Sequence, residues 1–440
     1  MSRQEPTTRT KVTSIPHWYD PKNDIMTVAD GENVRVRDDE GREYLDFCSQ
    51  LYCANLGHDN EAVIRAMDEQ ARRIPYVSSA KQSPVREELA GRLAEITPGR
   101  LSHTFFSVSG SEANEIAVQL AREYQDAPKV LTRWRSYHGG TYGAGSLTGD
   151  PDTRATIERH AATSGVSKFL PPLPNAFGTD DPAELARLAG EHLEFVIRNE
   201  GPESIAAILT EPVAGTSGAF PAPPGYFEHL RDLCNEYDVL LISDEVITGF
   251  GRCGDWFGIG TEGVEPDMLT FAKGITGAYS PLAGVVIGPE LAEFVGREGF
   301  DLGQTFAGHP VACAAGVAAI DEYADGVVEN VRDLEPVLRD GLRTIGNEHD
   351  VVNAVHGRGF LWGVEFADPD TGERFHDPRV DEGNNPVGDV IAVARERGVI
   401  FGSGRPAFQI ILSPPLIADR DDLERALTVL DEAISVTFEN

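Results

Sequence analysis

A lysine that directly follows a buried-type strand is the strongest sign of chemistry in this sequence. The chain has only six lysines, and five of them lie in polar surroundings. The sixth, Lys273, follows the apolar run MLTFA at residues 268–272. It could be a lysine whose amine snorkels from a strand end to water. It could also be a desolvated amine with a lowered pKa, which is a nucleophile suited to forming a Schiff base.

Two carboxylates follow a second apolar strand. The run VLLIS at residues 239–243 leads directly into Asp244 and Glu245. Charges at the end of a buried strand are costly unless they are paired or reach solvent. The motif alone is therefore compatible with an exposed strand end and with a buried carboxylate that has a specific partner.

A serine- and glycine-rich turn opens a predicted helix after a third strand. In SVSGSEANEIAVQLAR, residues 107–122, apolar residues recur at helical spacing after the SGSE segment. Ser109 and Glu112 have the spacing of a capping box. The same helix start, with Gly110 and Ser111, also offers the free N–H groups and the dipole that bind phosphate.

Two loops contain further candidates. The glycine-rich segment at residues 137–149 begins with Tyr137 and His138, and an aromatic residue there could belong to the core or lie flat against a planar ligand. Thr305 precedes an alanine-rich helix and could simply cap it. His309 is expected to be a loop or capping histidine and not a catalyst.

The elements that must position these residues alternate along the centre of the chain. Apolar strand-like runs occur at residues 103–108, 129–134, 206–212, 239–245, 268–272 and 282–288, and helical patterns lie between several of them. This alternation predicts an α/β fold with a mostly parallel sheet and helices on both of its faces. Ligands bind at the carboxyl ends of the strands in such sheets, which is where the candidates lie.

The two ends of the chain have a different pattern. Residues 25–46 show short alternating patterns with turn signals, and an α+β pattern follows residue 325. We expect both ends to build one smaller domain. The expected division is an arm and part of the small domain at 1–67, a large domain at 68–324 and the rest of the small domain at 325–440. The polar segment at 369–386 is expected to be an exposed loop.

The composition of the chain limits which molecules it is expected to bind and in which compartment it is expected to work. The chain has 38 basic and 71 acidic residues, a net charge of −33, which argues against nucleic acid and anionic membranes as partners. The acids are scattered, and arginine largely replaces lysine, as in proteins of halophiles that accumulate salt. The five cysteines are odd in number and lack C-x-x-C spacing, so we expect no disulfide framework, no metal site and a reducing cytoplasm. No apolar run could span a bilayer, and the first residues lack the apolar segment of a signal peptide.

In combination and in this order, the motifs resemble those of class III pyridoxal-phosphate aminotransferases, in particular the ω-amino acid:pyruvate subgroup. The stretches that carry the resemblance are SGSEANE, YHGGT, TEPVAG, LLISDEVITGFGRCGDWFG, PDMLTFAKGITGAYSPLAG and TFAGHPVACAA. The resemblance runs from about Trp18 to the C-terminus and is closest at residues 241–280. It implies fold type I of the aspartate aminotransferase superfamily, with pyridoxal 5′-phosphate as the cofactor.

The resemblance implies a role for each matched residue. Lys273 would form the Schiff base and carry the proton, and Asp244 would keep the pyridine nitrogen protonated. Gly110 and Ser111 would hold the phosphate, while Thr305 would reach the phosphate of a neighbouring subunit, which implies an obligate homodimer or a tetramer built from it. The other implied cofactor contacts are Tyr137 and Val246 on the two ring faces, His138, and Glu211, which in the family can pair with a substrate-binding arginine.

The implied substrate residues are Tyr52, Tyr76 and Arg405. Arg405 would be the mobile carboxylate clamp of the pyruvate-dependent enzymes, although it lies one residue closer to Pro414 than in many relatives. The alternative is a solvated surface arginine.

The expected reaction is a ping-pong transfer of an amino group from an ω-amino acid or amine, such as β-alanine, taurine or a polyamine fragment, to pyruvate. Transfer from 4-aminobutyrate to 2-oxoglutarate is a close alternative. An aminomutase acting on glutamate-1-semialdehyde shares the fold and needs no separate keto acid. A cofactor-free scaffold is disfavoured because Lys273 and Asp244 are both present.

Overall fold

The computed structural model describes residues 14–18, 25–159, 165–375, 383 and 385–438. Most of the expected N-terminal arm lies outside the described residues. The same holds for residues 376–382 and 384 of the expected polar loop.

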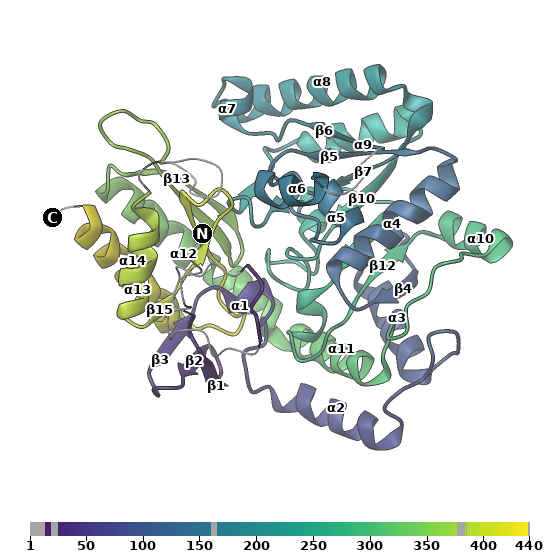
Figure 1. Ribbon diagram of the computed structural model, residues 1–440, viewed down its shortest axis with the longest axis horizontal. Helices are drawn as coiled ribbons and strands as arrows, with labels where there is room; N and C mark the ends of the chain where they lie inside the picture. The colour runs from purple at the N-terminus through teal and green to yellow at the C-terminus, as the bar shows by residue number, and fades with distance from the viewer. Residues whose placement is uncertain (1–13, 19–24, 160–164, 376–382, 384, 439–440) are drawn as a thin grey trace, which may run out of the picture.

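A seven-stranded sheet, in the order β4-β12-β11-β10-β7-β5-β6, forms the centre of the larger part of the molecule (Figure 1). Its strands are β4 (His103–Ser107), β5 (Lys129–Arg133), β6 (Val166–Phe169), β7 (Ile205–Thr210), β10 (Leu240–Asp244), β11 (Met268–Phe271) and β12 (Ala283–Ile287). Strand β12 pairs antiparallel with β11 and with β4, and the other four neighbouring pairs of this sheet are parallel. The predicted mostly parallel sheet and all six predicted strands are therefore confirmed. The seventh strand, β6, was not predicted, because its sequence VSKF has too few apolar residues to stand out.

Helices cover both faces of this sheet. Successive side chains of a strand point to opposite faces. In β10, Leu241 belongs to the apolar cluster that includes α8 (Pro182–Glu200) and α9 (Tyr226–Tyr237). Its neighbour Ile242 belongs to the cluster that includes α4 (Gly110–Gln125). The strands are apolar on both faces because helices cover both faces of the sheet. Their carboxyl ends lie between the two layers of helices.

The remaining helices surround this core. They are α1 (Ser49–Tyr52), α2 (Glu61–Arg73), α3 (Pro84–Ile96), α5 (Tyr142–Leu147), α6 (Pro151–Glu158), α7 (Pro174–Phe177), α10 (Pro289–Glu298) and α11 (Pro310–Glu322). Short elements in the loops are β8 (Val213–Ala214), β9 (Phe220–Pro221), η1 (Pro202–Ser204), η2 (Gly258–Glu262) and η3 (Lys273–Thr276).

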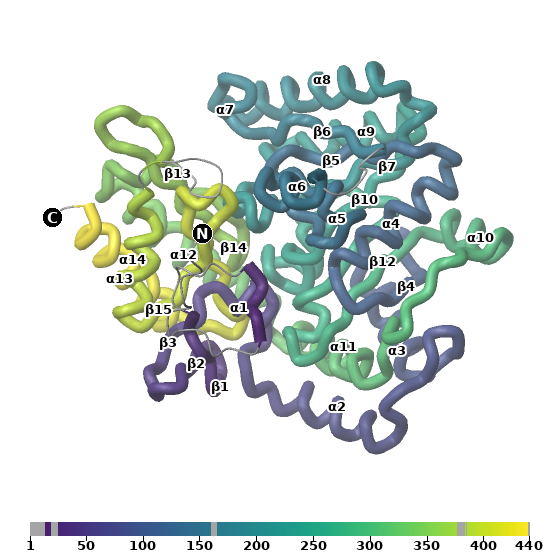
Figure 2. The backbone as a smooth tube through the Cα atoms, in the orientation of Figure 1, coloured from purple at the N-terminus to yellow at the C-terminus, as the bar shows by residue number. Residues whose placement is uncertain are grey.

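The two ends of the chain share a sheet. Strands β1 (Val28–Glu32), β2 (Arg35–Asp38) and β3 (Glu43–Asp46) form an antiparallel run, and β15 (Val399–Ile400) pairs with β3 in parallel. Figure 2 shows the purple N-terminal strands beside the chain's yellow-green C-terminal segments. A second sheet has the order β13-β14-β17-β16. Its strands are β13 (Val352–Arg358), β14 (Leu361–Phe366), β16 (Gly402–Ser403) and β17 (Gln409–Leu412).

Three helices pack beside these sheets: α12 (Val328–Glu348), α13 (Val387–Glu396) and α14 (Arg420–Phe438). Helix α11 leads into α12 through η4 (Tyr323–Val327), where Asp325 and Gly326 leave helical geometry. The expected boundary at 324/325 falls at this kink. The expected boundary at 67/68 falls within α2, which packs against α11.

In the part of the chain that the structure describes, no helix combines the length and the apolar character needed to cross a membrane. All five cysteines are free thiols.

Candidate active site

A cavity of about 850 Å³ lies at the carboxyl ends of the central strands. All but two of the predicted site residues line it. These are Tyr52, Gly110, Ser111, Tyr137, His138, Glu211, Asp244, Val246, Lys273 and Arg405. Residues that are separated by up to 353 positions in the sequence, as Tyr52 and Arg405 are, thus meet in one site.

Asp244 is a buried carboxylate with three hydrogen-bond donors. It is the last residue of β10 and is 3% exposed. Its Oδ2 accepts from His138 Nδ1 at 2.7 Å and from Asn114 Nδ2 at 2.8 Å, and its Oδ1 accepts from the Val246 N–H at 3.0 Å. Burial by itself raises the pKa of Asp244, but the bond and charge of His138, with the bonds from Val246 and Asn114, outweigh it and lower the pKa below its ordinary value. The Asp244 carboxylate is therefore an anion held in one position. It is not a charge at an exposed strand end, which was the alternative that the motif left open.

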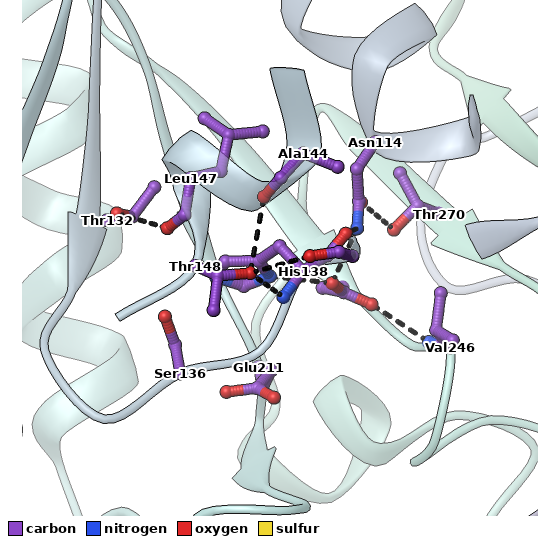
Figure 3. A network of polar contacts seen from close by, with 12 residues as sticks. Asn114, Thr132, Ser136, His138, Ala144, Leu147, Thr148, Glu211, Val246 and Thr270 are labelled. Atoms are coloured by element: carbon purple, nitrogen blue, oxygen red, sulfur yellow. Dashed lines mark hydrogen bonds and ion pairs between the residues drawn. The ribbon is translucent and has the colours of Figure 1, made fainter. Parts of the chain in front are cut away.

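Hydrogen bonds to both main-chain polar groups of His138 hold the loop that carries this residue (Figure 3). Its main-chain N–H donates to Thr148 Oγ1 at 2.9 Å, and its carbonyl accepts from Asn114 Nδ2 at 2.8 Å. Asn114 Oδ1 in turn accepts from Thr270 Oγ1 at 2.8 Å, on the strand beside Asp244. Asn114 thus ties α4, the loop and two strands to the carboxylate of Asp244.

Lys273 lies where β11 ends and η3 begins. Its φ of 49° is in the left-handed region, which a non-glycine residue adopts at a cost in free energy. Its Nζ lies 5.6 Å from the centroid of the Tyr52 ring. Burial lowers the pKa of the Lys273 amine, while the nearby charges of Asp244 and Glu211 oppose that shift only in part. A larger share of this amine is consequently neutral and nucleophilic than in a lysine exposed to water.

The start of α4 is both a capping box and an anion site. Ser109 Oγ accepts from the Glu112 N–H at 3.3 Å, and the Glu112 carboxylate accepts from the Val108 N–H at 3.0 Å. Within the described residues, the N–H groups of Gly110 and Ser111 have no acceptor. These donors and the dipole of a 16-residue helix suit a phosphate group.

Glycine is required at two positions of this cradle. A Cβ on Gly110 would lie 2.9 Å from a methyl group of Val246. Gly139 has a φ of 139°, and a Cβ there would lie 2.3 Å from Ser111 Oγ. Close approach of three chain segments therefore explains both glycines.

Glu211 is paired with a core arginine. Arg133 Nη2, from β5, donates to Glu211 Oε2 at 3.2 Å and to its carbonyl oxygen at 2.9 Å. Burial raises the pKa of Glu211, and the charges of His138 and Arg133 oppose it. The arginine that binds Glu211 is thus Arg133 and not Arg405, because β5 and β7 are adjacent strands.

Arg405 lies at the edge of the cavity with its own counterion. Its Nη1 donates to Asp150 Oδ2 at 3.2 Å and to Thr153 Oγ1 at 3.1 Å. Its Cζ lies 5.6 Å from the ring centroids of Trp18 and of Tyr137. The side chain is only 18% exposed, so the alternative of a solvated surface arginine is wrong.

The two remaining predicted residues lie together but away from the cavity of their own chain. The Tyr76 hydroxyl donates to the Thr305 carbonyl at 3.0 Å. The Tyr76 ring packs near the rings of Phe306 and His309, at centroid distances of 6.1 Å and 6.0 Å. Tyr76 and Phe306 are 41% and 58% exposed. Neither Tyr76 nor Thr305 lines the site of the single chain.

The structure brings further residues to the site that sequence reasoning missed, among them Trp18, Asn114, Asp150 and Arg133. A signal existed for Asn114, because it follows Ser111 by three residues and so shares its face of the helix. No local signal marks Asp150 or Arg133, since both depend on partners from distant segments.

A strand-end lysine, a buried carboxylate beside it, a helix N-terminus for an anion and a mostly parallel sheet define the class of pyridoxal-phosphate-dependent transferases of fold type I. The sequence matches the family model of aminotransferase class-III over residues 17–434. The chain belongs to the class III aminotransferases.

Individual relatives agree with this assignment. A probable aminotransferase of Mycobacterium tuberculosis is 36% identical over 424 residues, which cover 92% of this chain and 89% of the relative. A mitochondrial gamma-aminobutyrate transaminase of Oryza sativa subsp. japonica is 31% identical over 450 residues, with 96% and 83% covered. The crystal structure of taurine:2-oxoglutarate aminotransferase from Bifidobacterium kashiwanohense, in complex with PLP and glutamate, has 32% identity and a TM-score of 0.92 and covers 97% of this chain and 96% of that chain.

The enzyme uses pyridoxal 5′-phosphate, and the donor set of the cavity fits it. When bound, this cofactor supplies an aldehyde that condenses with amines and a protonated ring that accepts electrons. The Asp244 carboxylate suits the ring nitrogen, the N–H groups of Gly110 and Ser111 suit the phosphate, and the Lys273 amine suits the aldehyde. The reaction class is transamination.

Proposed function

We propose that this aminotransferase moves the amino group of an ω-amino acid or amine, such as β-alanine, taurine or a polyamine fragment, to a keto acid, with pyruvate as the main acceptor. The observation that carries the proposal is the arginine content of the cavity. Among the described residues that line it, Arg405 is the sole arginine. One guanidinium suits the single carboxylate of pyruvate, whereas a dicarboxylate would leave one charge without a partner.

Transfer to 2-oxoglutarate is the second candidate. The name of the Bifidobacterium relative contains this acceptor, and the rice relative is named for gamma-aminobutyrate. Among the described residues that line the cavity, the charged side chains besides Arg405 and Lys273 include the carboxylates Asp152, Glu211 and Asp244, which repel a second substrate carboxylate. This arrangement favours the shorter acceptor.

In this proposal each residue has a distinct task. The Lys273 amine would be the nucleophile towards the cofactor's aldehyde and would move a proton to and from the reacting carbon. Asp244, oriented by His138 and Asn114, would keep the ring nitrogen protonated. Gly110 and Ser111 would hold the phosphate, and Tyr137 and Val246 would lie against the ring.

The substrate contacts are Tyr52, beside the Lys273 amine, and Arg405, which binds the carboxylate. Tyr76 and Thr305 act in the site of a second subunit. Their exposure and their distance from their own cavity support that assignment, and with it an obligate homodimer.

A panel of amines, each offered pyruvate and 2-oxoglutarate, tests the proposal. We expect pyruvate to give the higher kcat/KM, and Arg405→Ala to raise the KM for pyruvate about 10- to 100-fold, the range expected for losing a charged hydrogen-bonded contact. The KM for a monoamine should change less than threefold. Faster turnover with 2-oxoglutarate would favour the second candidate. An amino-group shift within glutamate-1-semialdehyde without any keto acid would indicate an aminomutase.

We further infer a cytoplasmic protein adapted to high salt, with the large domain at 68–324 and the small domain at 1–67 and 325–440. Free cysteines and the net charge of −33 support this inference. Light scattering of the purified protein over a range of salt concentrations tests both the dimer and its dependence on salt.

A further inference from the structure

Arg405 reaches the cavity already paired with a buried carboxylate. Asp150 accepts from Arg405 Nη1 at 3.2 Å, and the Asp150 side chain is 1% exposed while that of Arg405 is 18% exposed. Solvent and salt screen such a pair much less than a surface pair. An approaching substrate carboxylate therefore meets a guanidinium whose charge is largely cancelled.

Asp150 is fixed in place by the fold and not by Arg405. It is the N-cap of α6, and its Oδ2 accepts from the Thr153 N–H at 3.1 Å and from Thr153 Oγ1 at 2.9 Å. The carboxylate would stay at the N-terminus of α6 whichever way Arg405 pointed.

Arg405 likewise has contacts that do not depend on Asp150. Its main-chain N–H donates to the Thr216 carbonyl at 2.8 Å, and the rings of Trp18 and Tyr137 flank its guanidinium at 5.6 Å. Within the described residues, its Nε and Nη2 have no acceptor, so these two donors are available to a substrate carboxylate. Removing the charge of Asp150 would thus leave the guanidinium close to its place and give it back its full charge.

We propose that Asp150 is a specificity-determining residue that weakens the binding of carboxylated substrates to Arg405, so that the site accepts amines without a carboxylate beside ω-amino acids and keto acids. The inference rests on the proposed function, in which Arg405 binds the carboxylate of the keto acid. Two carboxylates that share one cation in a partly buried site repel each other, so a keto acid binds against the charge of Asp150. A simple amine has no carboxylate to bring to Arg405, so this repulsion does not act on it.

Asp150→Asn tests this proposal, because asparagine removes the charge and is as good an N-cap as aspartate. The KM for pyruvate should fall roughly tenfold, as when a like charge is removed from a shared site. The KM for a monoamine such as butylamine should stay within twofold. Asp150→Ser, which also keeps a capping oxygen, serves if the asparagine variant does not fold.

Asp152→Asn is the matched control. Asp152 lies two residues along, lines the same cavity and makes no ion pair with Arg405 within the described residues. The measurements are made at about 1 M salt, where the Debye length is about 3 Å, so that general loss of negative charge is screened. Under these conditions Asp152→Asn should leave the KM for pyruvate within twofold. In an Arg405→Ala background, Asp150→Asn should change that KM less than in the wild type, because no guanidinium then holds the substrate carboxylate beside residue 150.

The outcomes separate this proposal from the one on which it rests. A higher KM for pyruvate in Asp150→Asn would mean that Asp150 orders Arg405 and does not compete with substrate, and would overturn the proposal. An unchanged KM, an equal shift for amine and keto acid, or an equal effect of Asp152→Asn would also overturn it. If Arg405→Ala raises the KM for pyruvate while Asp150→Asn does nothing, this proposal alone fails. If the wild-type enzyme transfers no amino group to any keto acid, the proposed function fails first.

Discussion

Replacing Asn114 by alanine should destabilise the protein and loosen Asp244 at the same time. The Asn114 side chain is 1% exposed and makes three hydrogen bonds of 2.8 Å, to the His138 carbonyl, to Asp244 Oδ2 and from Thr270 Oγ1. Alanine would leave the His138 carbonyl and the Thr270 hydroxyl buried without a partner within the described residues.

The size of the effect follows from these two groups. Each buried polar group that loses its partner costs about 1–3 kcal/mol, so the sum is about 4 kcal/mol. At about 2.1 cal/mol/K of unfolding entropy per residue, a chain of 440 residues has an unfolding entropy near 0.9 kcal/mol/K. The unfolding midpoint should therefore drop by about 4 °C. The pKa of Asp244 should rise, because one donor to its charged form is lost.

Differential scanning fluorimetry at fixed salt measures the midpoint, with and without added cofactor. Gln119→Ala is the matched control, because Gln119 lies on the same helix and, among the described residues, its amide bonds only the exposed Glu123 carboxylate, at 2.9 Å. Such a change should stay within about 0.5 kcal/mol. A midpoint for Asn114→Ala that equals that of Gln119→Ala would refute the view that Asn114 joins the helix, loop and strands of the site.

Three further predictions concern the reacting amine, pH and salt. Lys273→Ala should abolish turnover and also the covalent adduct that borohydride traps in the wild type, as measured by mass spectrometry; residual activity would contradict its role. Lys168 donates to Thr132 Oγ1 at 2.6 Å, to the Ser146 carbonyl at 3.1 Å and to the Leu147 carbonyl, and burial lowers its pKa from 10.5 to about 7. Because the folded-state pKa is the lower one, the unfolded chain binds more protons between pH 7 and 10.5; stability from this group is fully present above pH 10.5 and is lost as pH falls towards 7. Lys168→Met should therefore flatten the rise in unfolding midpoint between about pH 7.5 and 10, and a slope equal to that of the wild type would argue against it. Raising salt from about 0.1 M to about 1 M shortens the Debye length from about 10 Å to about 3 Å. Because the net charge is −33, this screening should weaken the repulsion within the folded chain and raise the unfolding midpoint. An unfolding midpoint that does not respond to salt would exclude adaptation to high salt.

The sequence by itself determined the order of the elements and the local chemistry at their ends. Apolar runs of strand length alternate with helical periods, so six strands of the central sheet could be located. The capping box of Ser109 and Glu112, the lysine after MLTFA and the aspartate after VLLIS are local patterns. They are readable because a turn, a cap or a strand end depends on neighbours within a few residues.

Only the tertiary structure decided which charges pair. Arg405 meets Asp150 across 255 residues, and Glu211 meets Arg133 across 78 residues because their strands are adjacent in the sheet. The same holds for Asn114, whose partners come from a loop and two strands. The physical reason is that a buried charge is stable only beside a counterion or donor, and which group stands there is set by how sheet and helices pack. Spacing along the chain does not contain that information.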